Sequence, residues 1–278
     1  MSDTHASTVL GGHRTGLAAT LRTDAWWIGP ALTFAGFSAF IIYSTWAGLQ
    51  GMHYFVDPYL SPMYSPLLWV QPGVAGGAPV ADAWFGTWPA WFPALIPVSP
   101  AVLIVGFPLS FRFTCYYYRK AYYRSFAMTP PGCAVSPIQR KKFLGEKGLL
   151  IFQNLHRYAL YAALVFLAIL SVDAVKSYFR AGHFGVGVGS IILTINPILI
   201  GLYTFGCHSL RHLVGGRLDC YSCDGVSGVR YTLWKRITAL NERHMLFAWM
   251  SLLWVGWTDL YIRLVSMGVL HDFNSWSS

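Results

Sequence analysis

Charged residues are scarce in this chain of 278 residues. Asp, Glu, Lys and Arg make up only 11% of it, whereas hydrophobic residues make up 55% and aromatic residues 17%. Soluble domains carry about 25% charged residues. The deficit argues against an ordinary water-soluble domain and indicates that lipid is the main solvent. Residues 1–24 are polar and lack a cleavable apolar core, so we expect no secretory signal peptide.

Motifs of several functional classes are also missing. The sequence has no Gly-rich phosphate loop, no nucleophile triad and no carboxylate dyad. It has no internal repeat, which argues against a transporter built from two inverted halves. The net charge is +9, but Lys and Arg stand beside apolar segments. We therefore expect these cations to orient a membrane protein, and we expect no nucleic-acid partner.

The apolar segments predict an all-α integral membrane protein with five transmembrane helices in one bundle. Crossing about 30 Å of hydrocarbon takes ~20 helical residues. The predicted spans are Trp26 to Leu49, Ala101 to Tyr123, Gly148 to Phe179, Val186 to Leu213 and Ile237 to Gly268. The predicted organisation is a tail at 1–25, a transmembrane domain at 26–268 and a second tail at 269–278.

The distribution of basic residues predicts the orientation. The loop at 50–100 contains two Asp and no Lys or Arg, whereas the loops at 124–147 and 214–236 are basic. Basic loops stay in the cytoplasm, so we expect a cytoplasmic N-terminus, an outer C-terminus and a bacterial inner membrane. The predicted basic rim, which we expect to contact lipid and a partner protein, consists of Arg119, Lys120, Arg124, Arg140, Lys141, Lys142, Arg217, Arg230, Lys235 and Arg236.

Four potential metal ligands stand inside four predicted spans. Each is within about one helical turn of a basic residue near the cytoplasmic side, so they share one depth although the helices alternate in direction. They are Cys115, His156, Cys207 and His244. Two Cys and two His are the donors of a Rieske-type [2Fe–2S] cluster, which is the favoured interpretation.

Other cofactors use similar residues. The same four donors suit structural zinc. His156 and His244 alone could hold one b-type haem, but the first two spans contain no His, which excludes a two-haem arrangement spread over four helices. A local Cys₂His₂ zinc set, formed by His208, His212, Cys220 and Cys223, is a further alternative. The plainer interpretation is that these two Cys and Cys133 are reduced loop thiols.

Polar residues near the four ligands predict a quinone site, although this pattern is less specific than the ligand set. Arg112 and Arg119 share the Cys115 face of one helix, with Tyr118 beside them. The full predicted set is Arg112, Tyr118, Arg119, Gln153, Arg211 and Asn241. Near the outer surface, Asp259 and Arg263 are spaced i, i+4 and are expected to form an ion pair. A quinone site near Asp173 and Asp259 is the alternative.

Several segments resemble one known family. They are FTCYYYRKAYYRSF with PPGCAV, KGLLIFQNLHRYALY, YTFGCHSLRHLVGG with DCYSC, and NERHMLFAWMSLLWVGWTDLYIRL. Over residues 100–265 the chain is similar to the membrane-anchor subunit of type F complex II, a succinate:quinone oxidoreductase. The resemblance implies a five-helix anchor, flavoprotein and iron–sulfur partner subunits on the cytoplasmic face, and quinone as electron acceptor. It also implies a cluster in place of haem on Cys115, His156, Cys207 and His244.

Two classes of function therefore remain open. The first is an electron-transfer anchor, which is a subunit of succinate dehydrogenase with succinate oxidation in its partners. The second is a non-redox polytopic carrier or scaffold. A higher oligomer of the complex, the type of quinone and the direction of electron flow stay undetermined by the sequence.

Overall fold

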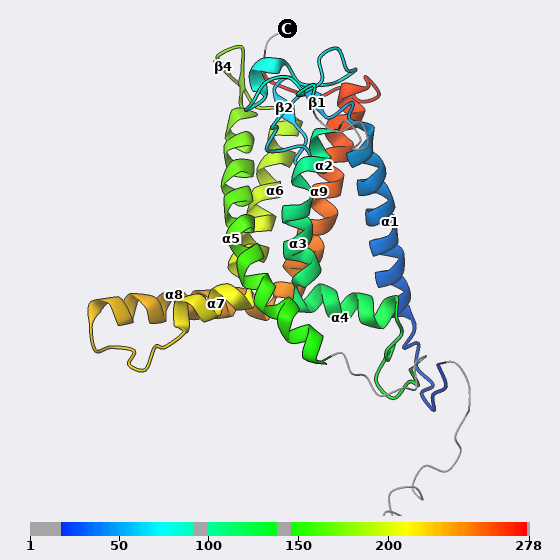
Figure 1. Cartoon of the computed structure of the whole chain (residues 1–278), viewed down its shortest axis with the longest axis vertical. Helices are drawn as coiled ribbons and strands as arrows, with labels where there is room; N and C mark the ends of the chain where they lie inside the picture. Colours follow the sequence, from blue (N-terminus) through cyan, green and yellow to red (C-terminus); the bar gives the residue numbers. More distant parts are fainter. Residues whose placement is uncertain (1–17, 92–98, 138–145, 277–278) are drawn as a thin grey trace, which may run out of the picture.

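The structure is a computed structural model that describes residues 18–91, 99–137 and 146–276, apart from the side chains of residues 146–150, 152 and 153. Long helices stand side by side as a bundle, and other helices lie across its lower end (Figure 1). The helices are α1 (Ile28–Gln50), η1 (Val80–Asp82), α2 (Pro100–Ile104), α3 (Gly106–Thr114), α4 (Tyr116–Ser125), α5 (Glu146–Lys176), α6 (Val188–Phe205), α7 (His208–Gly215), α8 (Gly225–Glu242) and α9 (His244–Ser266). Two antiparallel ribbons pair β1 (Phe55–Val56) with β2 (Tyr59–Leu60), and β3 (Phe179–Arg180) with β4 (His183–Phe184).

Four helices in the described residues are long and apolar enough to cross a bilayer. They are Ile28–Gln50, Asn154–Lys176, Val188–Phe205 and His244–Ser266. The first of these exposes large apolar side chains, including Leu32 at 68% and Ile42 at 71%. Such a surface is stable against acyl chains and not against water. The helical membrane architecture predicted from hydropathy is therefore confirmed at this level.

Three predicted spans had the wrong bounds because each ran through a bend. The second does not continue to Tyr123: α3 ends at Thr114, and α4 turns across the bundle. The fourth ends at Phe205, after which α7 turns away. Residues 237–242 of the fifth belong to α8, and α9 begins at His244. At the first bend Cys115 is followed by three Tyr residues, so the aromatic sequence hides the turn, whereas the other two bends pass through polar residues that were counted as part of the spans.

Residues 51–90 and 269–276 form a cap over one end of the bundle, which we call the upper end (Figure 1). The Tyr54 and Tyr64 rings stack at 4.3 Å in a small core of this cap. The Tyr64 hydroxyl donates to the Ala47 carbonyl oxygen of α1 at 2.6 Å. Near the chain end, Asn274 pairs with Gly187, just before α6. The cap therefore ties together the helix ends that it covers.

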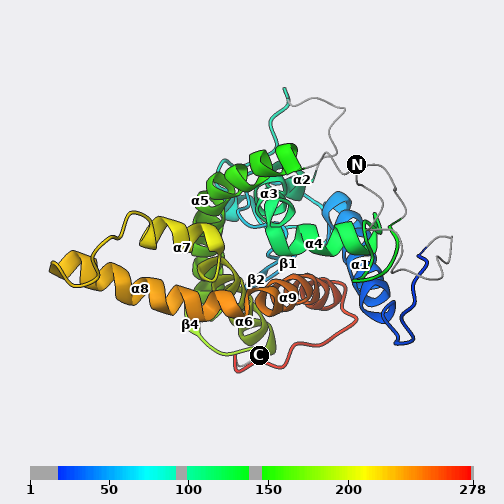
Figure 2. The same ribbon diagram turned by 90° about the horizontal axis from the view of Figure 1, so that it is seen from below.

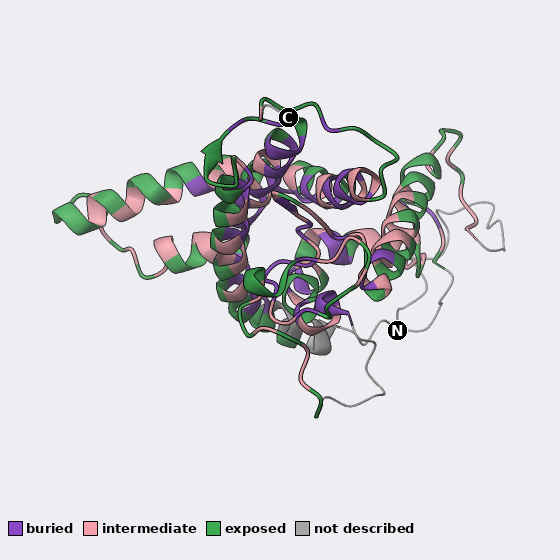
Figure 3. Ribbon diagram, turned by 90° about the horizontal axis from the view of Figure 1, so that it is seen from above, coloured by how far each residue is buried: buried purple, intermediate pink, exposed green. Residues whose placement is uncertain are grey.

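The main core lies near the opposite, lower end, where α4, α7 and α8 lie across the bundle. Helix α6 packs between α5 and α9, and α3 packs against α5. Buried faces point inward, as the view from above shows (Figure 3). The largest buried cluster includes Phe111, Leu160, Tyr203 and Leu252 together with two of the predicted ligands, Cys115 and Cys207. The predicted site is therefore part of the best-packed region among the described residues.

Candidate metal centre

The bends of the helices place the predicted ligands at one level. Cys115 separates α3 from α4 with φ −66° and ψ 131°, and Cys207 separates α6 from α7 with φ −67° and ψ 136°. Arg243, with φ −107° and ψ 15°, separates α8 from α9, so His244 is the first residue of α9. His156 lies within the continuous α5. Three of the four predicted ligands thus stand at the junction between a helix of the bundle and a helix that lies across its lower end.

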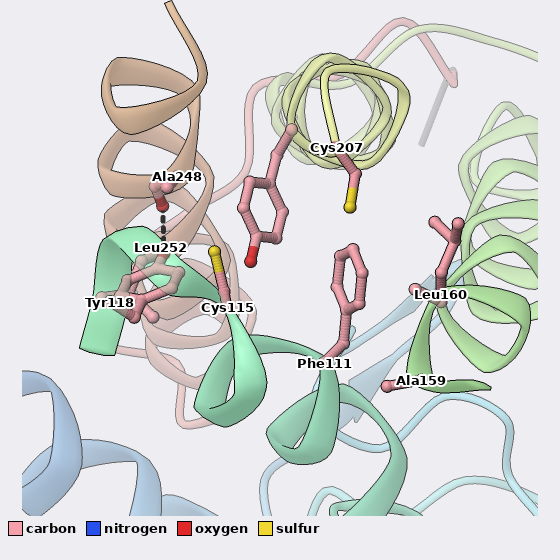
Figure 4. Packing of buried hydrophobic residues seen from close by; sticks show 10 residues of the cluster. Phe111, Cys115, Tyr118, Ala159, Leu160, Cys207, Ala248 and Leu252 are labelled. Carbon is pink, nitrogen blue, oxygen red and sulfur yellow. Dashed lines mark hydrogen bonds between the residues drawn. The ribbon is translucent and has the colours of Figure 1, made fainter. Parts of the chain in front are cut away.

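The structure brings the four side chains into two close pairs. The Cys115 Sγ lies 3.8 Å from the His244 Nε2, and the His156 Nε2 lies 3.1 Å from the Cys207 Sγ. All four are buried, with exposures of 2%, 2%, 7% and 0% in that order. Figure 4 shows the sulfurs of Cys115 and Cys207 in the same packed interior. The structure therefore shows proximity within each of the two pairs.

Within the described residues, no three His, Cys, Asp or Glu side chains gather closely enough to hold one metal ion. Each close pair contains one thiol and one imidazole. This arrangement does not favour a single closed zinc ion on all four donors, which would need them around one point. Two pairs of donors provide for two metal ions, but a Rieske-type cluster carries both imidazoles on one iron, whereas each close pair here joins one thiol to one imidazole.

A hydroxyl and an aromatic ring fix the orientation of His156. Its Nδ1 lies 2.8 Å from the Thr114 Oγ1. Its ring stacks on Phe111 with centroids 4.7 Å apart and planes at 5°. When the Nδ1 carries the proton and donates it to Thr114, the Nε2 keeps a free lone pair directed toward Cys207. Thr114 and Phe111 belong to α3, so the same bend that places Cys115 also orients His156.

His244 is held differently. Its ring stacks against Tyr203 with centroids 4.8 Å apart, and its Nδ1 is buried without a hydrogen-bond partner among the described side chains and backbone. A Cβ added at Gly206 would lie 3.2 Å from this Nδ1 and 3.0 Å from the Leu202 carbonyl oxygen. The absence of a side chain at position 206 therefore lets α6 approach the start of α9.

The predicted quinone residues do not form one group. Arg112 donates to the Tyr118 hydroxyl at 2.5 Å and to the Ser251 Oγ at 3.2 Å. Tyr118 in turn donates to the Ala248 carbonyl oxygen. These contacts join α3, α4 and α9 beside the Cys115–His244 pair. Arg112 and Tyr118 are thus the two members of the set that the structure places together.

The other predicted quinone residues stand apart. Arg119 is 8% exposed, and its guanidinium lies 5.2 Å from the Tyr116 ring. Arg211 donates to the Thr238 Oγ1 at 3.0 Å, and Asn241 donates to the Gly206 carbonyl oxygen at 2.7 Å. The last two contacts hold α8 against α7 and the end of α6. The side chain of Gln153 lies outside the described residues.

The alternative Cys₂His₂ zinc set is contradicted. Cys220 and Cys223 form a disulfide, so their sulfurs are not free thiolates, and the expectation of reduced thiols was wrong for this pair. Cys133 is a free, exposed thiol as expected. The Nε2 atoms of His208 and His212 lie 3.0 Å apart on α7. Partial burial, with His212 and Arg211 nearby, lowers the pKa of His208.

The predicted ion pair at the upper end is confirmed. The Arg263 Nε lies 3.4 Å from the Asp259 Oδ2, and both side chains are almost completely buried. The Asp259 carboxylate also accepts from the hydroxyls of Tyr43 and Ser61. Asp173 accepts from Ser65. Both carboxylates are bound to the cap or to neighbouring helices, so their contacts are structural.

Sequence reasoning missed four residues of the site, one of which is Phe111, which stacks on His156. Thr114, Tyr203 and Ser251 contact His156, His244 and Arg112 respectively. Thr114 directly precedes a ligand, and Tyr203 lies one turn before Cys207. A helical wheel of each span would have placed Tyr203 on the face of its ligand. The contact of Thr114 depends on the bend at Cys115 and had no signal in the sequence.

The fold and the site define a helical membrane protein with two thiols and two imidazoles buried near one end. The family model of the actinobacterial succinate dehydrogenase subunit SdhC matches residues 28–268 of this chain. The chain belongs to this family and is a membrane subunit of succinate dehydrogenase, whose catalysis lies in other subunits.

A solved structure agrees with this assignment. The chain is similar to a chain of the Mycobacterium smegmatis Sdh1 complex in the apo form, with 40% sequence identity and a TM-score of 0.81. The alignment covers 96% of this chain and 98% of that chain. No protein in the curated set matches this chain.

Proposed function

We propose that this subunit passes electrons from an iron–sulfur partner subunit to quinone, and that Cys115, His156, Cys207 and His244 hold one Rieske-type [2Fe–2S] cluster. The observation that carries this proposal is the burial of two thiols and two imidazoles, in two close pairs, where three spans bend. The His244 Nδ1 also lacks a hydrogen-bond partner in the described region. When bound, the cluster supplies one-electron transfer at a potential raised by its two His ligands.

The surrounding residues have separate roles in this proposal. Thr114 holds the His156 tautomer that leaves the Nε2 free. Phe111 and Tyr203 cover the two imidazole rings and exclude water from them.

The proposed membrane arrangement has five crossings. Residues 100–114 of α2 and α3 stand within the bundle beside the four longer spans (Figure 1), and we count them as the second crossing. At 1.5 Å per residue they extend about 22 Å. This length suits a crossing that ends at Cys115 inside the hydrocarbon, before it reaches the cytoplasmic headgroups. The basic lower end is then cytoplasmic and the cap lies outside a bacterial inner membrane.

Quinone is proposed to bind near the lower end, beside Arg112 and Tyr118. Arg112 offers guanidinium donors within a polar contact that also includes Ser251. The cation lies 5.1 Å from the Tyr203 ring, which itself covers His244. A quinone at this place would find hydrogen-bond donors next to the proposed ligands.

The flavoprotein and iron–sulfur subunits are proposed to dock below α4. Lys120 is exposed there, and Arg124 lies in the last turn of the same helix. Helix α4 begins directly after Cys115, so docking at this helix would bring a partner close to the proposed ligands. Of the predicted rim, Arg140, Lys141 and Lys142 lie outside the described residues.

The test is the double change His156→Ala and His244→Ala in the purified complex. We expect the paramagnetic signal of one [2Fe–2S] cluster and the quinone reduction activity to be lost, while the partner subunits still reduce a soluble dye. His212→Ala removes an exposed imidazole at the same end and should change neither. Survival of both signal and quinone activity in the double variant would refute the ligand assignment.

The optical spectrum of the same preparations separates the remaining alternatives. A haem-containing anchor would show a b-type haem spectrum that disappears in the double variant. A non-redox scaffold would show no cofactor spectrum beyond that of its partners in either form.

A further inference from the structure

Helices α7 and α8 with the loop between them form an arm, residues 208–242, that extends sideways from the lower end of the bundle. Figure 2 shows this arm reaching beyond the other helices in the view from below. In the part of the chain that the structure describes, α8 makes its main contacts with α7 and α6. The question is which partner this surface fits.

The arm is internally braced. Arg230 of α8 donates to the Val214 and Gly216 carbonyl oxygens at 3.0 and 2.7 Å, which satisfies the C-terminus of α7. The Trp234 ring packs so closely on Gly215 that an added Cβ would lie 2.3 Å from it. These contacts fix α8 relative to α7, so the exposed face of α8 is defined.

One side of α8 is an exposed apolar stripe. Val226 is 68% exposed, Val229 61% and Leu233 47%. The stripe continues through Leu240 and the buried Ile237, with spacings of three or four residues that keep all five on one helix face. Lys235 is exposed and lies on the opposite side of the helix. Helix α8 is therefore amphipathic.

The position of Ile237 shows where the stripe points. Ile237 is buried where α8 reaches the bundle, and α8 packs there against α6. Because α6 rises from this contact into the span region (Figure 1), the stripe faces the same side as the span. Phe205, in the last turn of α6, is itself 45% exposed.

The charge of the arm limits the choice of partner. Residues 208–242 contain five Lys or Arg and three Asp or Glu. Arg236 is exposed at the edge of the apolar stripe. An apolar face directed at the bilayer, with a cation at its margin, matches helices that lie in the membrane interface and contact anionic headgroups.

We propose that α8 lies in the cytoplasmic interface of the bilayer, with Val226, Val229 and Leu233 among the acyl chains and Arg236 on anionic lipid phosphates. The arm is then a lateral lipid-binding element of the anchor, separate from the surface below α4 that faces the partner subunits. The proposal requires the membrane insertion of the bundle but neither the cluster nor the quinone site.

The test uses spin labels in the assembled complex, reconstituted in nanodiscs of phosphatidylcholine with phosphatidylglycerol. In a Cys133→Ser background, Val229→Cys in the apolar stripe and the control Lys235→Cys on the opposite side of α8 are labelled. We expect the Val229 label to collide more with dissolved oxygen than with a water-soluble nickel chelate, and the Lys235 label to show the reverse. Equal access of the chelate to both labels, or a Val229 label immobilised and shielded from both reagents as in a protein interface, would overturn the proposal.

A second comparison tests the headgroup contact. Arg236→Gln should make the Val229 label shallower, and Lys235→Gln, the same loss of charge on the far side of the helix, should have a smaller effect. Nanodiscs of phosphatidylcholine alone should remove the difference between the two variants. An equal effect of both changes in the anionic nanodiscs would contradict a phosphate contact of Arg236.

Discussion

The two ends of the bundle bury polar side chains in different ways. At the upper end, Asp259 accepts from Tyr43 at 2.6 Å and pairs with Arg263, which also donates to Gln50 at 2.7 Å. At the lower end, in the part of the chain that the structure describes, the His244 Nδ1 and the Tyr203 hydroxyl are buried without a hydrogen-bond partner. The buried polar side chains named at the upper end have hydrogen-bond partners within the chain, whereas these two atoms at the lower end do not.

This difference suits a stabilising role for the upper end and a binding role for the lower end. A buried polar group without a partner costs about 1–3 kcal/mol, and membrane proteins keep such groups mainly where they bind or conduct something. The upper network joins the cap to α1 and α9 and needs nothing more. Of the two thiols and two imidazoles at the lower site, the His244 Nδ1 has no hydrogen-bond partner in the described region, as a group held for a resident cofactor would.

The largest expected effect is on stability and comes from the upper end. Asp259→Asn leaves the Arg263 charge buried without its counter-charge, and breaking a buried pair in this way costs about 3–5 kcal/mol. We expect a clearly lower thermal unfolding midpoint, with normal cluster content in the protein that remains folded. Asp57→Asn is the control, because its pair with Arg180 is half exposed and contributes about 0–1 kcal/mol. Equal midpoints for the two variants would contradict the structural role of the upper pair.

At the lower end, Thr114→Val should affect the cofactor and leave stability nearly unchanged. The change removes the hydroxyl that contacts the His156 Nδ1, and the loss of such a partner typically lowers metal affinity or activity by about 10–100-fold. Cluster occupancy and quinone reduction are the measurements. Thr114→Ser should restore both, since it keeps the hydroxyl. A Val variant with full occupancy and normal activity would show that Thr114 only fills space.

Gly206→Ala tests the close approach of α6 and α9. The new Cβ would lie 3.0 Å from the Leu202 carbonyl oxygen and 3.2 Å from the His244 Nδ1. Overpacking of this kind costs about 1–3 kcal/mol, and we expect lower cluster occupancy as His244 is displaced. Gly201→Ala in the same helix meets only side-chain atoms at 3.7 Å or more and should be tolerated. Tolerance of both changes would show that the approach at Gly206 is not tight.

The smallest expected effect concerns the arm, which is far from both networks. Asp224 accepts from the Ser227 backbone N–H at 2.7 Å and caps α8, and this contact lowers the pKa of Asp224. The cap is therefore complete above the ordinary pKa of about 3.9 and is lost as the pH falls through the lowered value. Asp224→Ala should speed hydrogen exchange in the first turn of α8 at neutral pH, whereas Asp219→Ala should not. Equal exchange in both would exclude the cap.

The sequence predicts much of this architecture, because apolar length and basic loops are local properties. Helices α1 and α5 lie within three residues of their predicted bounds. The depth argument groups Cys115, His156, Cys207 and His244, and the structure places these side chains in two close pairs. A shared distance from the basic loops constrains position across the membrane even when helices alternate in direction.

The bends and the contacts that depend on them could not be predicted in this way. Cys115 interrupts a helix with neither Pro nor Gly among its immediate neighbours, so no local signal marks the turn into α4. Once the turn is missed, the rotation of α4 is unknown, and Arg119 seems to share a site with Arg112. The structure separates them, because α4 lies across the bundle while α3 stands within it (Figure 1).

The most direct test of the central claim is a redox titration of the complex, followed by paramagnetic resonance, with and without the double change His156→Cys and His244→Cys. Two His ligands on one iron place Rieske-type clusters at about −150 to +300 mV, compared with about −400 mV for all-Cys plant-type clusters. The account predicts a signal in the upper range for the native complex and its displacement toward the lower value in the variant. A native complex without such a signal, or a signal whose potential is unchanged by the double change, would contradict the assignment of these two histidines as cluster ligands.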